Sequence, residues 1–108
     1  MTSTSNSLTD SPNSEGYVLR LFIVGTSTIS VRAIQNLQRI CDEYLEGNYE
    51  LEIIDAHQQP LLVAAEDVTA IPMLIKKSPG PKRRLVGDMS NTSKVLKGLG
   101  ILTIENGK

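Results

Sequence analysis

The densest group of charged side chains in the sequence is basic and lies in the last third of the chain. Five of the eleven Lys and Arg residues fall within nine positions: Lys76, Lys77, Lys82, Arg83 and Arg84. Such a group is typical of a solvated hairpin whose charges protect a sheet edge from aggregation. It is equally typical of a docking strip for an acidic protein surface, where charge speeds association more than it raises affinity.

Nucleic acid is a poorer match to this strip than an acidic protein. No aromatic side chains alternate with the basic ones to stack on bases. The net charge of the whole chain is −1, so no overall field attracts it to phosphate or to anionic lipid. We therefore expect a protein partner, and neither nucleic acid nor a membrane.

Residues that usually catalyse reactions are sparse. The single cysteine, Cys41, excludes an internal disulfide, a dithiol pair and a cysteine metal cage. The single histidine, His57, lies in the polar loop AHQQP with no neighbour that completes a triad or a metal set. Glu66 and Asp67 are adjacent, so on a helix they point about 100° apart and make a poor acid–base pair. We predict no enzyme activity, no cofactor and no bound metal.

Apolar periodicity indicates how these residues are positioned. Two-residue alternation and short apolar runs predict strands, and three- and four-residue steps predict amphipathic helices. The expected elements are strands at 17–24, 49–54, 73–77 and 83–87, and helices at 30–46, 60–68 and 93–102. This β-α-β-α-β-β-α order is that of a thioredoxin-like domain in the α/β class.

The ends of the chain have a different composition. The segment 1–16 (MTSTSNSLTDSPNSEG) is rich in Ser, Thr and Asn, which predicts a disordered tail rather than a signal peptide. One domain is expected at 17–104, followed by a short tail at 105–108. No apolar run approaches the roughly twenty residues that span a bilayer. A chain with one cysteine fits a reducing cytoplasm.

In redox-active thioredoxin-like proteins, the catalytic thiol pair follows the first strand. Here that segment is Gly25-Thr-Ser-Thr-Ile-Ser30, which contains hydroxyls but no thiol, so dithiol exchange is excluded. Cys41 falls on the apolar face of the predicted helix and is expected to be a core residue. Pro72, which precedes the third strand, is expected to follow a cis peptide bond, as the corresponding proline does in this fold.

The sequence of the last third of the chain does not strongly favour a single structure. Gly98 and Gly100 each cost about 1 kcal/mol relative to Ala inside a helix. The segment ILTI at 101–104 suits a strand as well as a helix end.

The longer motifs carry a resemblance to a known family. YVLRLFIVG, SVRAIQNL, YELEIIDAHQQPLLVAAEDVTAIPML and PKRRLVGDMSNTSKVLKGLG closely resemble the KaiB family of circadian-clock proteins, from Tyr17 to about Leu102. The resemblance implies a non-catalytic protein that rests as a homo-oligomer, a tetramer or a dimer, in a second fold peculiar to the family. It implies that a rare thioredoxin-like monomer docks on the ring of a KaiC-type hexameric ATPase, captures a KaiA-like protein and displaces a sensor kinase.

The resemblance also suggests roles for individual residues. Tyr17 and Tyr49 match positions that support the resting oligomer, while Pro72, Gly98 and Gly100 belong to the segments that rearrange. Arg32, Arg83 and Arg84 match basic positions of the family, which favours the docking strip. Glu66 and Asp67 fall in the helix that contacts the ring.

Three departures separate this sequence from the clock members of the family. Position 67 is Asp where those members have Lys, and position 100 is Gly where they have Asp. The acidic C-terminal tail is nearly absent. These departures suggest a paralogue, for which a stress-response adaptor is the alternative to a clock role. A degenerate glutathione-binding protein is the third possibility, and the missing thiol counts against it.

Overall fold

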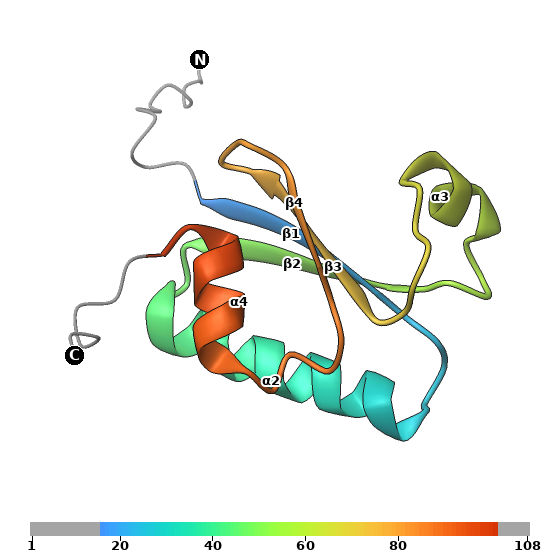
Figure 1. Cartoon of the computed structure of the whole chain (residues 1–108), viewed down its shortest axis with the longest axis horizontal. Helices are drawn as coiled ribbons and strands as arrows, with labels where there is room; N and C mark the ends of the chain where they lie inside the picture. The colour runs from blue at the N-terminus through green and yellow to red at the C-terminus, as the bar shows by residue number, and fades with distance from the viewer. Residues whose placement is uncertain (1–15, 102–108) are drawn as a thin grey trace, which may run out of the picture.

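The computed structural model describes residues 16–101. The expected N-terminal tail, apart from Gly16, and the expected C-terminal tail lie outside the described residues, as does most of the ambiguous segment 101–104. Seven elements follow in the predicted order: β1 (Tyr17–Ile23), α2 (Thr28–Tyr44), β2 (Tyr49–Asp55), α3 (Pro60–Ala65), β3 (Met73–Ser78), β4 (Arg83–Val86) and α4 (Thr92–Leu99) (Figure 1).

The four strands form one sheet in the order β2-β1-β3-β4. β1 and β2 run parallel, with Tyr17 opposite Tyr49, and α2 provides the crossover between them. β3 is antiparallel to both β1 and β4. β2 and β4 are therefore the edge strands.

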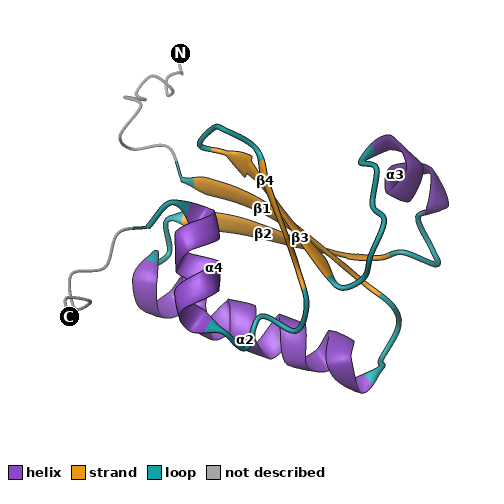
Figure 2. Cartoon of the chain, in the orientation of Figure 1, coloured by secondary structure: helices purple, strands orange, loops and turns teal. Residues whose placement is uncertain are grey.

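The two faces of the sheet are covered unequally, as Figure 2 shows. α2 and α4 lie together on one face, where strand alternation directs Leu19, Leu21 and Leu74 into the larger core cluster. The opposite face holds a smaller cluster formed by Phe22, Ile54, Met73 and Ile75. The short helix α3 covers that second cluster with partly buried side chains, Leu62 and Val63 among them, and has no buried residue of its own.

Local signals explain where the helices begin and end. The Ser27 hydroxyl accepts a hydrogen bond from the Ser30 amide at the start of α2, and Asn91 does the same for Lys94 at the start of α4. Gly100 ends α4 in the left-handed conformation, at φ 79°. α3 ends at Ala65, earlier than predicted, and Asp67 has a left-handed φ of 59° that breaks the helix.

Candidate protein-docking site

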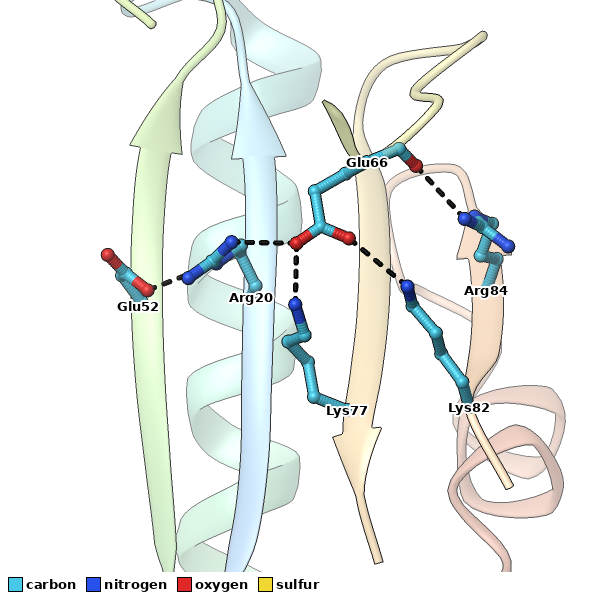
Figure 3. A network of polar contacts seen from close by, with 6 residues as sticks. All are labelled: Arg20, Glu52, Glu66, Lys77, Lys82 and Arg84. Atoms are coloured by element: carbon cyan, nitrogen blue, oxygen red, sulfur yellow. Dashed lines mark hydrogen bonds and ion pairs between the residues drawn. The ribbon is translucent and has the colours of Figure 1, made fainter. Parts of the chain in front are cut away.

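A single carboxylate, that of Glu66 at the end of α3, gathers three basic side chains (Figure 3). Its Oε2 atom accepts hydrogen bonds from Arg20 Nη1 at 2.8 Å and from Lys77 Nζ at 2.5 Å. Its Oε1 atom lies 3.3 Å from Lys82 Nζ. The Glu66 side chain is only 8% exposed, so these three cations replace most of the water that a carboxylate would otherwise hold.

Two further contacts extend this network, which we name the Glu66 cluster. Arg84 Nη2 donates to the Glu66 backbone carbonyl at 3.0 Å, and Arg20 Nε donates to Glu52 Oε1 at 3.1 Å. The cluster therefore ties the end of α3 to β1, β2, β3 and the β3–β4 hairpin. Its four cations outnumber its two carboxylates, and its members are Arg20, Glu52, Glu66, Lys77, Lys82 and Arg84.

The cations lower the pKa of Glu66 below its ordinary value of 4.5. The hydrogen bond from Lys77 is the largest cause, and burial opposes it by penalising the charged form. Glu66 is therefore ionised at neutral pH and keeps its partners in place. Glu66 was predicted to contact a partner, and in this structure its side chain is buried and bonds mainly to cations of the same domain.

The predicted basic strip does not form one surface, because strand alternation separates its members. Lys77 points to the α3 face and joins Glu66, as do Lys82 and Arg84. Lys76 points to the α2/α4 face and is 4% exposed. Burial is the main cause that lowers its pKa, and Arg83 adds to the effect. Arg83 is exposed on β4.

Arg32 lies apart from the Glu66 cluster, on the exposed side of α2. Its Nη1 atom is 3.9 Å from Asp88 Oδ2, and its side chain is 65% exposed. Hydrogen bonding by the Ser90 hydroxyl is the main cause that lowers the pKa of Asp88, and the Ser90 amide, which donates to Asp88 Oδ1, adds to it. The Asn36 side chain donates to the Asp88 backbone carbonyl at 2.9 Å. Arg32 is thus a surface cation beside the loop that leads into α4.

α3 offers the most exposed large apolar side chain among the described residues, Leu61 at 85%. Asp67, two residues beyond the helix, is exposed as well. Leu61 belongs to the helix that Glu66 ends, and Asp67 directly follows Glu66, so one short segment of the chain carries an exposed apolar residue, an exposed acidic residue and the carboxylate of the Glu66 cluster.

The residues expected to take part in rearrangement occupy well-defined positions. Tyr17 and Tyr49 are register partners at the start of the parallel strands, and the Tyr49 hydroxyl donates to Asp42 at 2.7 Å. The Ile71–Pro72 peptide bond is cis, as expected. Gly98 packs against β4 so closely that a β-carbon there would lie 2.6 Å from Leu85 Cδ1.

The position of a thioredoxin thiol pair is occupied by two hydroxyls. Ser27 Oγ donates to Ser30 Oγ at 2.9 Å, and Ser30 is buried. Cys41 lies in the larger core cluster, as predicted, and burial raises its pKa to about 12. Between residues 16 and 101 no group of three His, Cys, Asp or Glu side chains is arranged to hold a metal. Over the same range no helix has the length and apolar character that crossing a bilayer requires.

A profile of the KaiB domain matches residues 20–101 of this sequence. The chain belongs to the KaiB family. The match spans every element of the fold, from within β1 to just beyond α4, so this KaiB-family protein shares the whole described domain with its relatives.

Individual relatives agree with this assignment. The circadian clock protein KaiB3 of Synechocystis is 51% identical over 85 residues, covering 79% of this chain and 83% of its own. The circadian clock oscillator protein KaiB of Thermosynechococcus vestitus is 41% identical over 96 residues, covering 89% of each. The KaiB-family protein is therefore related to circadian clock proteins over most of its length.

Solved structures confirm the thioredoxin-like fold. The N-terminal domain of Synechococcus elongatus SasA superposes with a TM-score of 0.66 at 21% identity, covering 93% of this chain and 91% of that one. Mitochondrial thioredoxin 3 of Saccharomyces cerevisiae gives 0.64 at 18% identity, with 86% and 88% covered. At these identities the likeness concerns the fold alone.

Sequence reasoning did not foresee that Glu66 joins the basic residues. The missed partners are Arg20 and Glu52, which come from β1 and β2. One signal was present, because Arg20 is the only charged residue in the first apolar run. A cation on a strand that is otherwise buried requires a carboxylate nearby.

Proposed function

We propose that this KaiB-family protein is a non-catalytic regulator that docks on the ring of a KaiC-type hexameric ATPase. The contact surface consists of α3, Asp67 and the exposed parts of the Glu66 cluster. The observation that carries the proposal is the side chain of Leu61, which is 85% exposed on a helix with no buried residue. An isolated six-residue helix is unstable in water, so its position on the sheet depends on the packing of Leu62 and Val63 and on the Glu66 cluster.

The charges of this surface suit a partner surface that carries both signs. Lys77 and Lys82 are 33% and 45% exposed although both contact Glu66. They retain free donor positions for acidic partner side chains. Asp67, the exposed residue that follows Glu66, carries the opposite charge, and clock members of the family are expected to have Lys there. We therefore propose that Asp67 selects which ring is bound.

Further parts of the proposal follow from family membership. Arg32 and Arg83 provide additional basic contacts. Lys76 is buried opposite Arg83 in the β3–β4 pair and acts only through its positive charge. A KaiA-like protein and a sensor kinase are the expected further partners. The SasA domain shares the fold at 21% identity, and competition with a domain of this fold for one ring surface is part of the proposal. A resting homo-oligomer with Tyr17 and Tyr49 at its contacts stays a prediction, as do rearrangement around Pro72, Gly98 and Gly100 and a cytoplasmic location.

The test is size-exclusion chromatography with light scattering. The protein is incubated with each purified KaiC-type hexamer of its own genome and ATP for up to a day. We expect one hexamer to be shifted to larger mass, and Leu61→Ser to weaken this complex at least tenfold. Ile29→Ser is the matched control, because Ile29 is an exposed apolar residue at the other helix, α2.

Asp67→Asn and Asp67→Lys test ring selection. Asn tolerates the left-handed φ of this position, so it removes the charge with little effect on the backbone. We expect Asp67→Lys to change the preference among hexamers and Asp67→Asn to give an intermediate result. If no hexamer is shifted after a day, the proposal of ATPase docking is wrong.

A further inference from the structure

β4 is an edge strand whose outer side has no partner among the described residues. The Gly87 amide donates to the Pro72 carbonyl at 3.0 Å, so this pair lies at a hydrogen-bonded position of the antiparallel ladder. In such a ladder, hydrogen-bonded and non-hydrogen-bonded pairs alternate. The backbone N–H and C=O groups of Leu85 therefore point toward β3, whereas those of Arg84 and Val86 point outward, away from the sheet.

A pocket of about 190 Å³ lies at the end of this edge. Its apolar wall includes Leu85, Met89 and Val95, and Lys94 lies at its polar side. Val86 also borders the pocket and is 51% exposed. The pocket has room for one aliphatic side chain, and it adjoins the outward backbone groups of the strand.

The opposite end of β4 is basic. Lys82 and Arg83 are exposed where the strand begins, and Arg83 has no ion-pair partner within residues 16–101. The guanidinium of Arg84 contacts a neutral carbonyl, that of Glu66, so its charge is not cancelled there. The nearest acidic residue of the following loop, Asp88, already accepts from the Ser90 amide. The edge thus runs from a basic start to an apolar end.

We infer that the outer edge of β4 binds an extended acidic segment of another protein as a fifth, antiparallel strand. The backbone groups of Arg84 and Val86 supply hydrogen bonds to the added strand, as in other cases of strand addition. An antiparallel segment places an apolar side chain near its N-terminus in the pocket and acidic side chains near its C-terminus beside Lys82 and Arg83. This inference does not rest on docking by α3: Lys82 and Arg83 serve both proposals, but the strand edge and the pocket are used only here.

The test uses an acetylated, fluorescein-labelled peptide, Leu-Thr-Val-Thr-Glu-Glu, and its reversed sequence. Binding to the full chain is measured by fluorescence anisotropy with no ATPase present. We expect the first peptide to bind with a dissociation constant below 1 mM and at least tenfold more tightly than the reversed one. We also expect slower deuterium exchange at the Arg84 and Val86 amides in the complex.

Val86→Pro is the decisive variant. It removes one outward N–H and blocks the edge, but no hydrogen bond to β3, and proline is tolerated on edge strands. We expect at least a tenfold loss of peptide binding, whereas Val86→Thr, which keeps the N–H, binds as the natural chain does. Circular dichroism of both variants verifies that the domain is folded.

Charge reversal separates strand addition from electrostatic attraction alone. We expect Arg83→Glu to weaken binding severalfold, and Arg39→Glu, on the exposed side of α2, to leave it unchanged. Three results would each overturn the inference: no binding at 1 mM peptide, equal binding of the reversed peptide, or full binding by folded Val86→Pro protein.

Discussion

The two faces of the sheet are stabilised by different interactions. The α2/α4 face is a continuous apolar layer, in which Leu21, Leu37 and Ile40 are fully buried. The α3 face has a small apolar cluster at one end and the Glu66 cluster beside it. One face thus depends on burial, which is non-directional, and the other depends on hydrogen bonds and ion pairs with fixed geometry.

This difference shows how a small domain can keep one helix available for a partner. A helix that packs as α2 does is buried along its inner side and contributes most of the stability. α3 is held by the partly buried Leu62 and Val63 and by the carboxylate at its end, so Leu61 on its outer side remains free for contact. Under the proposed function, recognition uses the face of the sheet opposite to the larger apolar core.

The largest expected effect is on the α2/α4 face. Leu37→Ala removes a fully buried side chain, and we expect the free energy of unfolding to fall by about 3 kcal/mol. Val63→Ala is the matched change on α3, where the side chain is only partly buried, and we expect a loss of about 1 kcal/mol or less. Urea denaturation measures both. Equal losses would contradict the comparison of the two faces.

A smaller effect is expected from the Glu66 cluster. Glu66→Gln keeps the shape of the side chain but removes its charge, which leaves Lys77 and Lys82 without a counter-ion and Arg20 with Glu52 alone. We expect a loss of about 2 kcal/mol at pH 7, below the value for a fully buried pair because the cations are partly exposed. A loss no larger than that of Glu50→Gln, an exposed residue on β2, would show that the cluster does not stabilise the fold.

The same variant has a defined pH dependence. The pKa of Glu66 is lower in the folded chain than its ordinary value of 4.5. Its contribution to stability is therefore complete above about pH 4.5 and is lost as the pH falls through the lower, folded pKa. Urea midpoints of the natural chain should approach those of Glu66→Gln between pH 4.5 and pH 2. A constant difference between the two urea midpoints over that pH range would contradict the lowered pKa of Glu66.

The smallest expected effect concerns the contact of α4 with β4. Gly98→Ala gains up to about 1 kcal/mol of helix propensity, but its β-carbon would lie 2.6 Å from Leu85 Cδ1. We expect these effects to nearly cancel, with a net change under about 0.5 kcal/mol. In a Leu85→Val background the same change should be stabilising, with a coupling of about 1 kcal/mol by urea denaturation. If the effects of Gly98→Ala and Leu85→Val on the free energy of unfolding are additive, the Leu85 side chain moves without cost to make room for the new β-carbon.

The order of the elements could be predicted because periodicity is a local property of the sequence. The alternation around Leu19 and the helical spacing around Leu37 are visible in short windows. The end of α3 could not be predicted in the same way. The pattern continues to Val68, but the left-handed backbone at Asp67 stops the helix and Glu66 is held by side chains from other strands.

The candidate site was only partly predictable for the same reason. The sequence indicates that Lys77, Lys82 and Arg84 are close together, since they lie on one predicted hairpin. It does not indicate that all three contact Glu66, a residue outside that hairpin: the two lysines contact its carboxylate and Arg84 its backbone carbonyl. Strand alternation places the adjacent Lys76 and Lys77 on opposite faces, but which of the two faces the buried α2/α4 side depends on how the helices cover the sheet.

The hydroxyl pair at the start of α2 has a consequence for the conditions in which this protein can act. Ser27 and Ser30 keep the spacing of a thioredoxin thiol pair but have no oxidised form that links them. The only sulfhydryl, Cys41, is buried and has a pKa of about 12, so almost none of it is thiolate at neutral pH. The fold is therefore insensitive to the glutathione potential around it.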